Sequence, residues 1–156
     1  MEESKDRLIE AAVNLGESLG LNRAVCQIYA LLYLSDKPLS PTEIGKFLEM
    51  SKGNVSINLR TLEQWNAVKK VWRKGYSRAL YTANENIEEI ILNKLKTGLE
   101  KRLSYAKPLI EQVKQKNKVK SNDDHFTKKI NQIEKLISKI EFFLDNFETI
   151  KSMTVE

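Results

Sequence analysis

The chain has 156 residues, of which 41% are hydrophobic and 30% are charged, a composition typical of a globular protein rather than a disordered one. No apolar run reaches the roughly 18 residues that a membrane span needs, and the charged N-terminal segment lacks the features of a signal peptide. The single cysteine, Cys26, cannot form an intrachain disulfide, so we expect a cytoplasmic protein.

Positive charge is concentrated in two segments of the chain. Residues 52–78 contain seven cationic side chains and one carboxylate, and residues 94–120 contain nine cationic side chains and two carboxylates. Residues 1–51, by contrast, contain five cationic and eight acidic side chains. Two basic segments beside an acidic one favour a polyanionic partner. For residues 94–120, a solvated helix face explains the charge equally well.

The first two predicted helices cover residues 2–19 and 22–34. Apolar residues recur at helical spacing in the first, and the second is almost entirely apolar, so we expect it to lie at the centre of the core. Gly20 is a suitable residue to end the first helix, and Asn22 is placed to cap the second.

A short third helix is predicted to begin at Pro41. Ser40 and Glu43 stand at the N-cap and N3 positions, the spacing of a capping box, and proline favours the first helical position. Ile44, Phe47 and Leu48 should form its apolar face.

A fourth helix is predicted over residues 52–65, with Ser51 as its N-cap. Asn66 follows it, and asparagine tolerates the left-handed conformation that ends many helices. The inward stripe is narrow, and together with earlier positions it predicts a core formed by Val25, Ile28, Leu32, Ile44, Phe47, Val55, Leu59 and Leu62.

After Asn66 the apolar period changes from that of a helix to that of a strand. Residues 67–83 therefore predict a β-hairpin whose turn, KGYSR, carries Lys74 and Arg78.

The remainder of the chain is predicted to be helical. One helix should cover about 86–118, with Pro108 kinking or breaking it near Ser104, and a last helix should run over about 126–150. The apolar stripe of the last helix is broader than one neighbouring helix can cover.

These elements predict a mainly α fold. A winged helix-turn-helix domain would occupy residues 1–84, with the helix-turn-helix at about 41–65 and the wing at about 67–83, and a long-helix dimerisation region would occupy 85–156.

A helix that enters a DNA major groove, about 12 Å wide, benefits from short outward side chains that allow close approach. Cationic and amide side chains beside them can reach phosphates or base edges. The candidate DNA-binding residues are Ser51, Lys52, Gly53, Asn54, Ser56, Arg60, Lys74 and Arg78.

The stretch LSPTEIGKFLEMSKGNVSINLRTLEQWNAVKKVW resembles the winged-helix core of the GbsR branch of MarR-type regulators, and the resemblance extends through the wing and the helical tail. It implies a homodimeric transcriptional regulator, usually a repressor, that contacts double-stranded DNA through the recognition helix and the wing. The family usually has glycine where this chain has Asn66. Its wings often carry an acidic residue where this chain has Tyr76, so a wing salt bridge to Arg78 is not expected.

Other candidate residues have simpler explanations. Cys26 could sense oxidants, but its apolar helix favours core packing. His125 stands beside Asp123 and Asp124, a segment with too few ligands for a metal site, so helix capping is favoured. Trp65 and Trp72 could stack on bases, although their positions favour core or hairpin packing.

No catalytic triad, phosphate loop or cysteine cluster is present in the sequence, so we expect neither enzymatic activity nor a cofactor. The main alternative function is a winged-helix module that binds protein, such as a subunit of the transcription apparatus. Ile57 on the outward face fits that alternative, whereas the cationic residues fit DNA. Whether an unidentified small-molecule effector binds is left open by the sequence.

Overall fold

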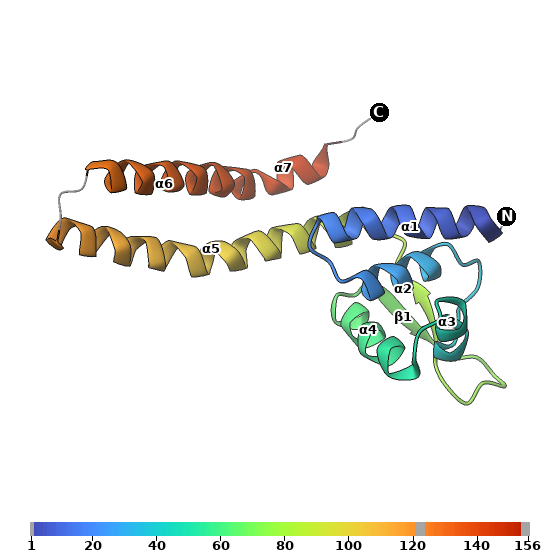
Figure 1. Cartoon of the computed structure of the whole chain (residues 1–156). Helices are drawn as coiled ribbons and strands as arrows, with labels where there is room; N and C mark the ends of the chain where they lie inside the picture. The colour runs from blue at the N-terminus through green and yellow to red at the C-terminus, as the bar shows by residue number, and fades with distance from the viewer. Residues whose placement is uncertain (1, 121–123, 154–156) are drawn as a thin grey trace. The chain divides into compact units, whose positions relative to one another are not determined.

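The computed structural model describes residues 2–120 and 124–153. The prediction of a mainly α protein with one hairpin is confirmed. The elements in chain order are α1 (Glu2–Ser18), α2 (Arg23–Tyr33), α3 (Pro41–Phe47), α4 (Lys52–Gln64), β1 (Val68–Val71), β2 (Leu80–Ala83), α5 (Ile87–Lys120), α6 (Asp124–Asp145) and α7 (Phe147–Ser152) (Figure 1). None of the helices in the described ranges is long and apolar enough to cross a lipid bilayer.

The predicted helix starts are confirmed by their hydrogen bonds. The Asn22 side chain accepts from the N–H groups of Ala24 and Val25, which begins α2. Ser40 and Glu43 form a complete capping box at α3. These bonds satisfy N–H groups that have no partner inside the helix.

Two helices end at residues whose backbone has a left-handed conformation. Gly20 has a φ of 79° after α1, and Asn66 has a φ of 55° after α4, both as the sequence predicts. Glu49 has a φ of 54° in the turn between α3 and α4, which no sequence pattern indicated. Two left-handed residues therefore bracket the predicted recognition helix.

Two compact units make up the chain, Met1–Ile90 and Ile91–Glu156. In the first unit, α2 packs against α1 on one side and α4 on another, and the β-hairpin completes the core (Figure 1). The largest fully buried side chains of this core are Val13, Ile28, Leu32, Ile44, Val55, Leu59 and Leu62.

Phe47 is an exception to the predicted core, because 41% of it is exposed. The short helix α3 inserts Ile44 fully into the core, and Leu48, one turn later, packs against the same cluster. Phe47 lies to the side of this pair and remains at the rim.

The hairpin is antiparallel and pairs Val68 with Ala83 and Val71 with Leu80. Leu39 adds a bridge to the outer side of β2, exchanging two backbone hydrogen bonds of 2.8 and 2.9 Å with Tyr81. The wing is thereby attached to the residue that immediately precedes the cap of α3.

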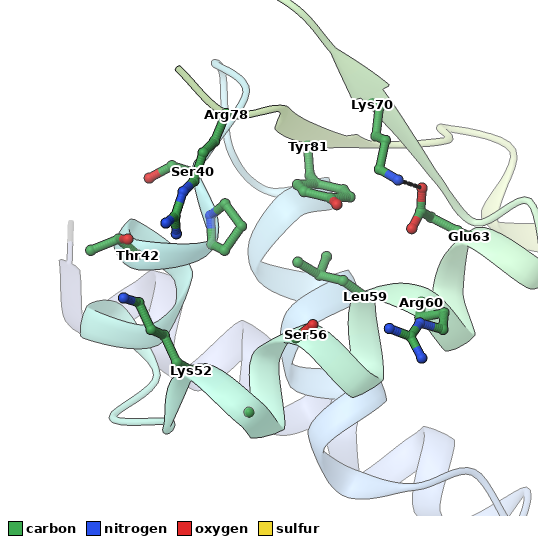
Figure 2. Close-up of a pocket in the computed structure, with 12 residues that line it drawn as sticks. Ser40, Thr42, Lys52, Ser56, Leu59, Arg60, Glu63, Lys70, Arg78 and Tyr81 are labelled. Carbon is green, nitrogen blue, oxygen red and sulfur yellow. Dashed lines mark ion pairs between the residues drawn. The ribbon is translucent and has the colours of Figure 1, made fainter. Parts of the chain in front are cut away.

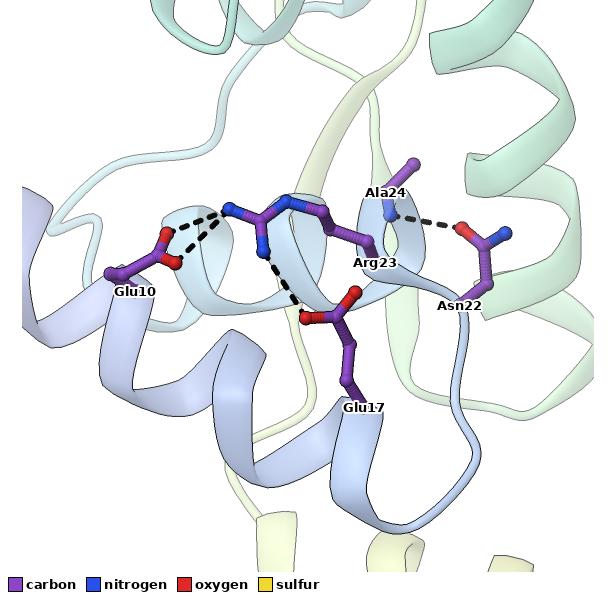
Figure 3. A network of polar contacts seen from close by, with 5 residues as sticks. All are labelled: Glu10, Glu17, Asn22, Arg23 and Ala24. Atoms are coloured by element: carbon purple, nitrogen blue, oxygen red, sulfur yellow. Dashed lines mark hydrogen bonds and ion pairs between the residues drawn. The ribbon is translucent and has the colours of Figure 1, made fainter.

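One arginine fastens α1 to α2. Arg23 donates to both carboxylate oxygens of Glu10, at 2.9 and 3.1 Å, and to Glu17 at 3.1 Å (Figure 3). These ion pairs raise the pKa of Arg23, with the hydrogen bond to Glu10 as the largest cause. The pairs are exposed, so each contributes little stability by itself.

In the second unit, α5 continues through Pro108 instead of breaking near Ser104. The proline removes a single intrahelical hydrogen bond, the one to the carbonyl of Ser104. Both residues are exposed, so water can solvate that carbonyl.

The predicted last helix is interrupted. Asn146 separates α6 from α7, and its side-chain amide donates to the carbonyl of Phe142 at 2.8 Å. An asparagine that bonds to its own helix in this way competes with the regular backbone pattern. Much of the apolar surface of this unit stays exposed, at Tyr105, Leu109, Val113, Phe126, Ile133, Leu136, Phe142 and Phe143.

Candidate nucleic-acid interface

The outward face of α4 carries most of the candidate residues. Lys52, Gly53, Asn54, Ser56 and Arg60 are all exposed, while the opposite face of the helix is buried. Ser51 precedes them and accepts a hydrogen bond from the N–H of Asn54, so its hydroxyl has a structural role as the N-cap. Ile57, in the centre of this face, is 66% exposed.

Gly53 is not required by the fold. A β-carbon added at this position would meet nothing within 4 Å, and the residue has an ordinary helical conformation. Glycine inside a helix costs roughly 0.5–1 kcal/mol relative to alanine. Gly53 therefore leaves a part of the exposed helix surface without a side chain, for no reason found in the packing of the fold.

A buried amide that was not among the predicted site residues fixes the orientation of Asn54. Asn58 is 8% exposed, and its Nδ2 donates to the backbone carbonyl of Asn54 at 2.8 Å and to its side-chain Oδ1 at 2.6 Å. Because a carbonyl can only accept, the donor must be the Asn58 NH₂ group, and the atom that faces it must be the Asn54 oxygen. Asn54 therefore turns its own NH₂ group outward. The helical position of Asn58, at the edge of the apolar stripe, was the signal for its burial.

The wing and α4 enclose a hollow of about 560 Å³. Figure 2 shows Lys52 of α4 and Arg78 of the wing extending toward the start of α3, around Ser40 and Thr42. Five of the eight candidates line the hollow, whereas Ser51, Asn54 and Lys74 do not. The lining residues are Ser40, Pro41, Thr42, Lys52, Gly53, Ser56, Leu59, Arg60, Glu63, Lys70, Arg78 and Tyr81.

One of the seven cations between residues 52 and 78 is neutralised within the chain. Lys70 pairs with Glu63 at 2.8 Å and lies 5.9 Å from the centroid of the Tyr81 ring (Figure 2). The hydrogen bond to Glu63 is the main cause that raises the pKa of Lys70. This pair connects the last turn of α4 to the wing. Across the described ranges, no ion pair is found for the other six: Lys52, Arg60, Lys69, Arg73, Lys74 and Arg78.

The carboxylate of Glu43, in the first turn of α3, is also hydrogen-bonded within the chain. Glu43 accepts from both the backbone N–H and the hydroxyl of Ser40, each at 2.7 Å. The backbone hydrogen bond is the largest cause that lowers the pKa of Glu43. The hydrogen bonds and the N-terminal end of α3 thus stabilise the ionised form of Glu43.

The second basic segment has partners of its own. Lys107 pairs with Glu141, Lys114 with Glu134 at 2.7 Å, and Lys96 with Glu148 at 3.6 Å. These pairs involve three of the nine cations, and all three carboxylates belong to α6 or α7. Internal pairing thus accounts for part of the charge between residues 94 and 120.

The remaining candidates differ in outcome. Cys26 is 8% exposed and packs in the core, as predicted, and burial raises the pKa of its thiol. Trp65 packs against the core, but the prediction of packing is wrong for Trp72, which is 71% exposed. The indole follows β1 directly, where the two strands have already separated and offer it no opposing surface. His125 lies in the first turn of α6, and Asp123 lies outside the described residues.

Comparisons with known proteins agree with this architecture. Residues 19–71 match the model of the MarR family. The HTH-type transcriptional repressor GbsR of Bacillus subtilis is 25% identical over 93 residues, covering 60% of this chain and 51% of that protein. The HTH-type transcriptional repressor OpcR of the same organism is 23% identical over 113 residues, covering 72% of this chain and 61% of its own.

A third curated relative, the putative HTH-type transcriptional regulator YvaV of Bacillus subtilis, is 27% identical over 86 residues and covers 55% of this chain and 49% of that protein. The chain thus spans about half to three fifths of the length of these relatives. A solved structure described as a transcriptional regulator matches with a TM-score of 0.67 at 14% identity, covering 95% of each chain, which supports the fold.

Proposed function

We propose that the protein is a winged helix-turn-helix regulator of the MarR type that binds double-stranded DNA and represses transcription, since residues 19–71 match the model of that family. The observation that carries the proposal is the outward face of α4 together with Arg78 of the wing. On this surface Lys52, Arg60 and Arg78, for which the described residues offer no ion-pair partner, lie beside a stretch of helix that has no side chain at Gly53. A duplex offers phosphates to the cations and a groove to the helix.

The candidate residues divide into two roles. Arg60 and Asn54 stand on the outward face of α4, where arginine suits guanine and an outward NH₂ group suits an acceptor on a base edge. Lys74 and Arg78, on the wing, are placed to bind phosphates or to enter a minor groove. Arg60→Ala should reduce discrimination between operator and random DNA by roughly 1–3 kcal/mol for each lost bidentate contact.

The protein acts as a homodimer in this proposal. The support is the second unit, in which Leu109, Leu136 and Phe142 are 61%, 58% and 71% exposed. Water contact with so much apolar surface is unfavourable, and a second copy would remove it. A two-fold axis would also place two recognition helices on half-sites about 34 Å apart.

Sedimentation tests the dimer directly. Leu136→Asp places a charge in the exposed apolar surface and should yield a monomer, with the winged domain still folded. Asn131→Asp adds the same charge to the same helix, outside the apolar stripe, and should leave the dimer intact. A wild-type monomer at micromolar concentration would refute this part of the proposal.

The alternative of a protein-binding winged helix rests on the exposure of Ile57. A salt titration separates the two functions, because release of counterions from DNA makes affinity fall steeply with salt. Fragments of genomic DNA enriched by the purified protein would supply the operator for the titration. Failure to enrich any fragment, or affinity that is insensitive to salt, would favour the alternative.

A further inference from the structure

The wing exposes an indole that the fold does not use. Trp72 is 71% exposed, and Tyr76 in the same loop is 55% exposed. Tryptophan is highly buried on average because its large apolar surface is unfavourable in water. The other tryptophan of the chain, Trp65, follows that rule and packs against the core.

The surroundings of Trp72 are cationic. Arg73 and Lys74 follow it directly, Arg78 stands at the other end of the same loop, and residues 72–79 contain no carboxylate. None of these three cations has an ion-pair partner among the residues that the structure describes. A ligand for this loop therefore needs negative charge next to apolar surface.

The loop also adjoins the surface already assigned to DNA. Arg78 lines the hollow together with Lys52 and Arg60 of α4, so a ligand that occupies the hollow reaches the wing (Figure 2). The last pair of the hairpin is Val71 with Leu80, which places Trp72 one residue and Arg78 two residues beyond it. Both side chains thus belong to the short connection between the strands.

We propose that Trp72 is a DNA-contacting residue of the wing: its indole packs against deoxyribose at the edge of a groove, while Arg73 and Lys74 pair with the flanking phosphates. The inference rests on the proposed function and adds an apolar contact to it. Sugars are the same at every base pair, so this contact strengthens binding without selecting a sequence. It also involves no ion pair, so it is independent of salt.

Fluorescence can follow this residue alone. In a Trp65→Phe variant, Trp72 is the only tryptophan, and its emission can be quenched by acrylamide before and after addition of a duplex. Binding of the duplex is measured separately by the anisotropy of a label on the DNA. We expect the quenching constant to fall several-fold when the duplex binds.

A second variant measures the contribution to affinity. Trp72→Ala should weaken binding on the order of tenfold, equally for operator and random DNA, through loss of buried apolar contact. The slope of log K against log salt should stay unchanged. Lys74→Ala, the matched control in the same loop, should lower the steepness of that slope. The thermal midpoint of Trp72→Ala should equal that of the wild type, since an exposed side chain adds little to the core.

The outcomes separate the two proposals. If the duplex binds and Trp72 remains as accessible to acrylamide as before, this inference is wrong and the proposed function stands. If no duplex binds at any salt concentration, both are wrong. A marked fall in the thermal midpoint of Trp72→Ala would assign the indole a structural role instead and overturn the inference.

Discussion

The salt dependence of DNA binding by a variant that lacks one lysine should show how many copies of the protein bind the operator. Six cations of residues 52–78 have no partner within the described part of the chain, and each phosphate they neutralise contributes about −0.9 to the slope of log K against log salt. If all six engage, one copy gives a slope of about −5 and a symmetric dimer about −11. Lys74→Ala removes one such contact per copy, so the slope should become shallower by about 0.9 for a monomer and about 1.8 for a dimer.

The measurement is a titration of labelled operator by anisotropy at several salt concentrations, with wild type and variant in parallel. Lys5→Ala is the control, because Lys5 is exposed on α1, which contributes no residue to the hollow. We expect a change near 1.8 for Lys74→Ala and none for Lys5→Ala. A change near 0.9 would contradict symmetric binding by two copies, and an unchanged slope would show that Lys74 lies away from the phosphates.

Three further predictions concern stability and the positioning of the interface. Leu62→Ala should lower the free energy of unfolding by about 2–5 kcal/mol, whereas Phe47→Ala, at the exposed rim, should cost clearly less in the same urea titration. The pKa of Glu43 is lowered in the folded state, so its contribution is present above the ordinary glutamate pKa and is lost as pH falls through the folded value; Glu43→Gln should flatten stability against pH in this acidic range. Asn58→Leu replaces a buried amide with an apolar group of similar size and should leave the melting temperature within a few degrees of wild type. It should nevertheless reduce discrimination between operator and random DNA, since Asn54 loses its fixed orientation; unchanged discrimination would show that this orientation is unimportant.

The parts of the fold that depend on neighbouring residues were predictable from the sequence. A cap such as Asn22 or Ser40 accepts hydrogen bonds from N–H groups two or three residues away, so a short stretch of sequence is enough to predict it. The same holds for Asn66, whose left-handed conformation depends on its own side chain. The inward stripe of α4 followed from helical geometry alone.

The features that are not predictable from the sequence depend on residues that are distant along the chain. The exposure of Phe47 results from how far α3 inserts into the core, which no local pattern encodes. The exposure of Trp72 depends on where the two strands separate, and the pairing of Lys70 with Glu63 depends on how the wing returns to α4. Of the two effects predicted for Pro108, a kink or a break, the break does not occur, because the carbonyl that the proline leaves unpaired belongs to an exposed residue that water can solvate.

The way α4 is held has a consequence for how such a protein can be retargeted. Its ends are set by Ser51 and Asn66, and its inner face is fixed by the core, so the exposed side chains at Lys52 and Arg60 and the open position at Gly53 are not needed to form the helix. A library randomised at Lys52, Gly53 and Arg60 should therefore yield mostly folded members that differ in the DNA they prefer. If the proposed function holds, the specificity for DNA could therefore be changed at these positions while the fold is kept.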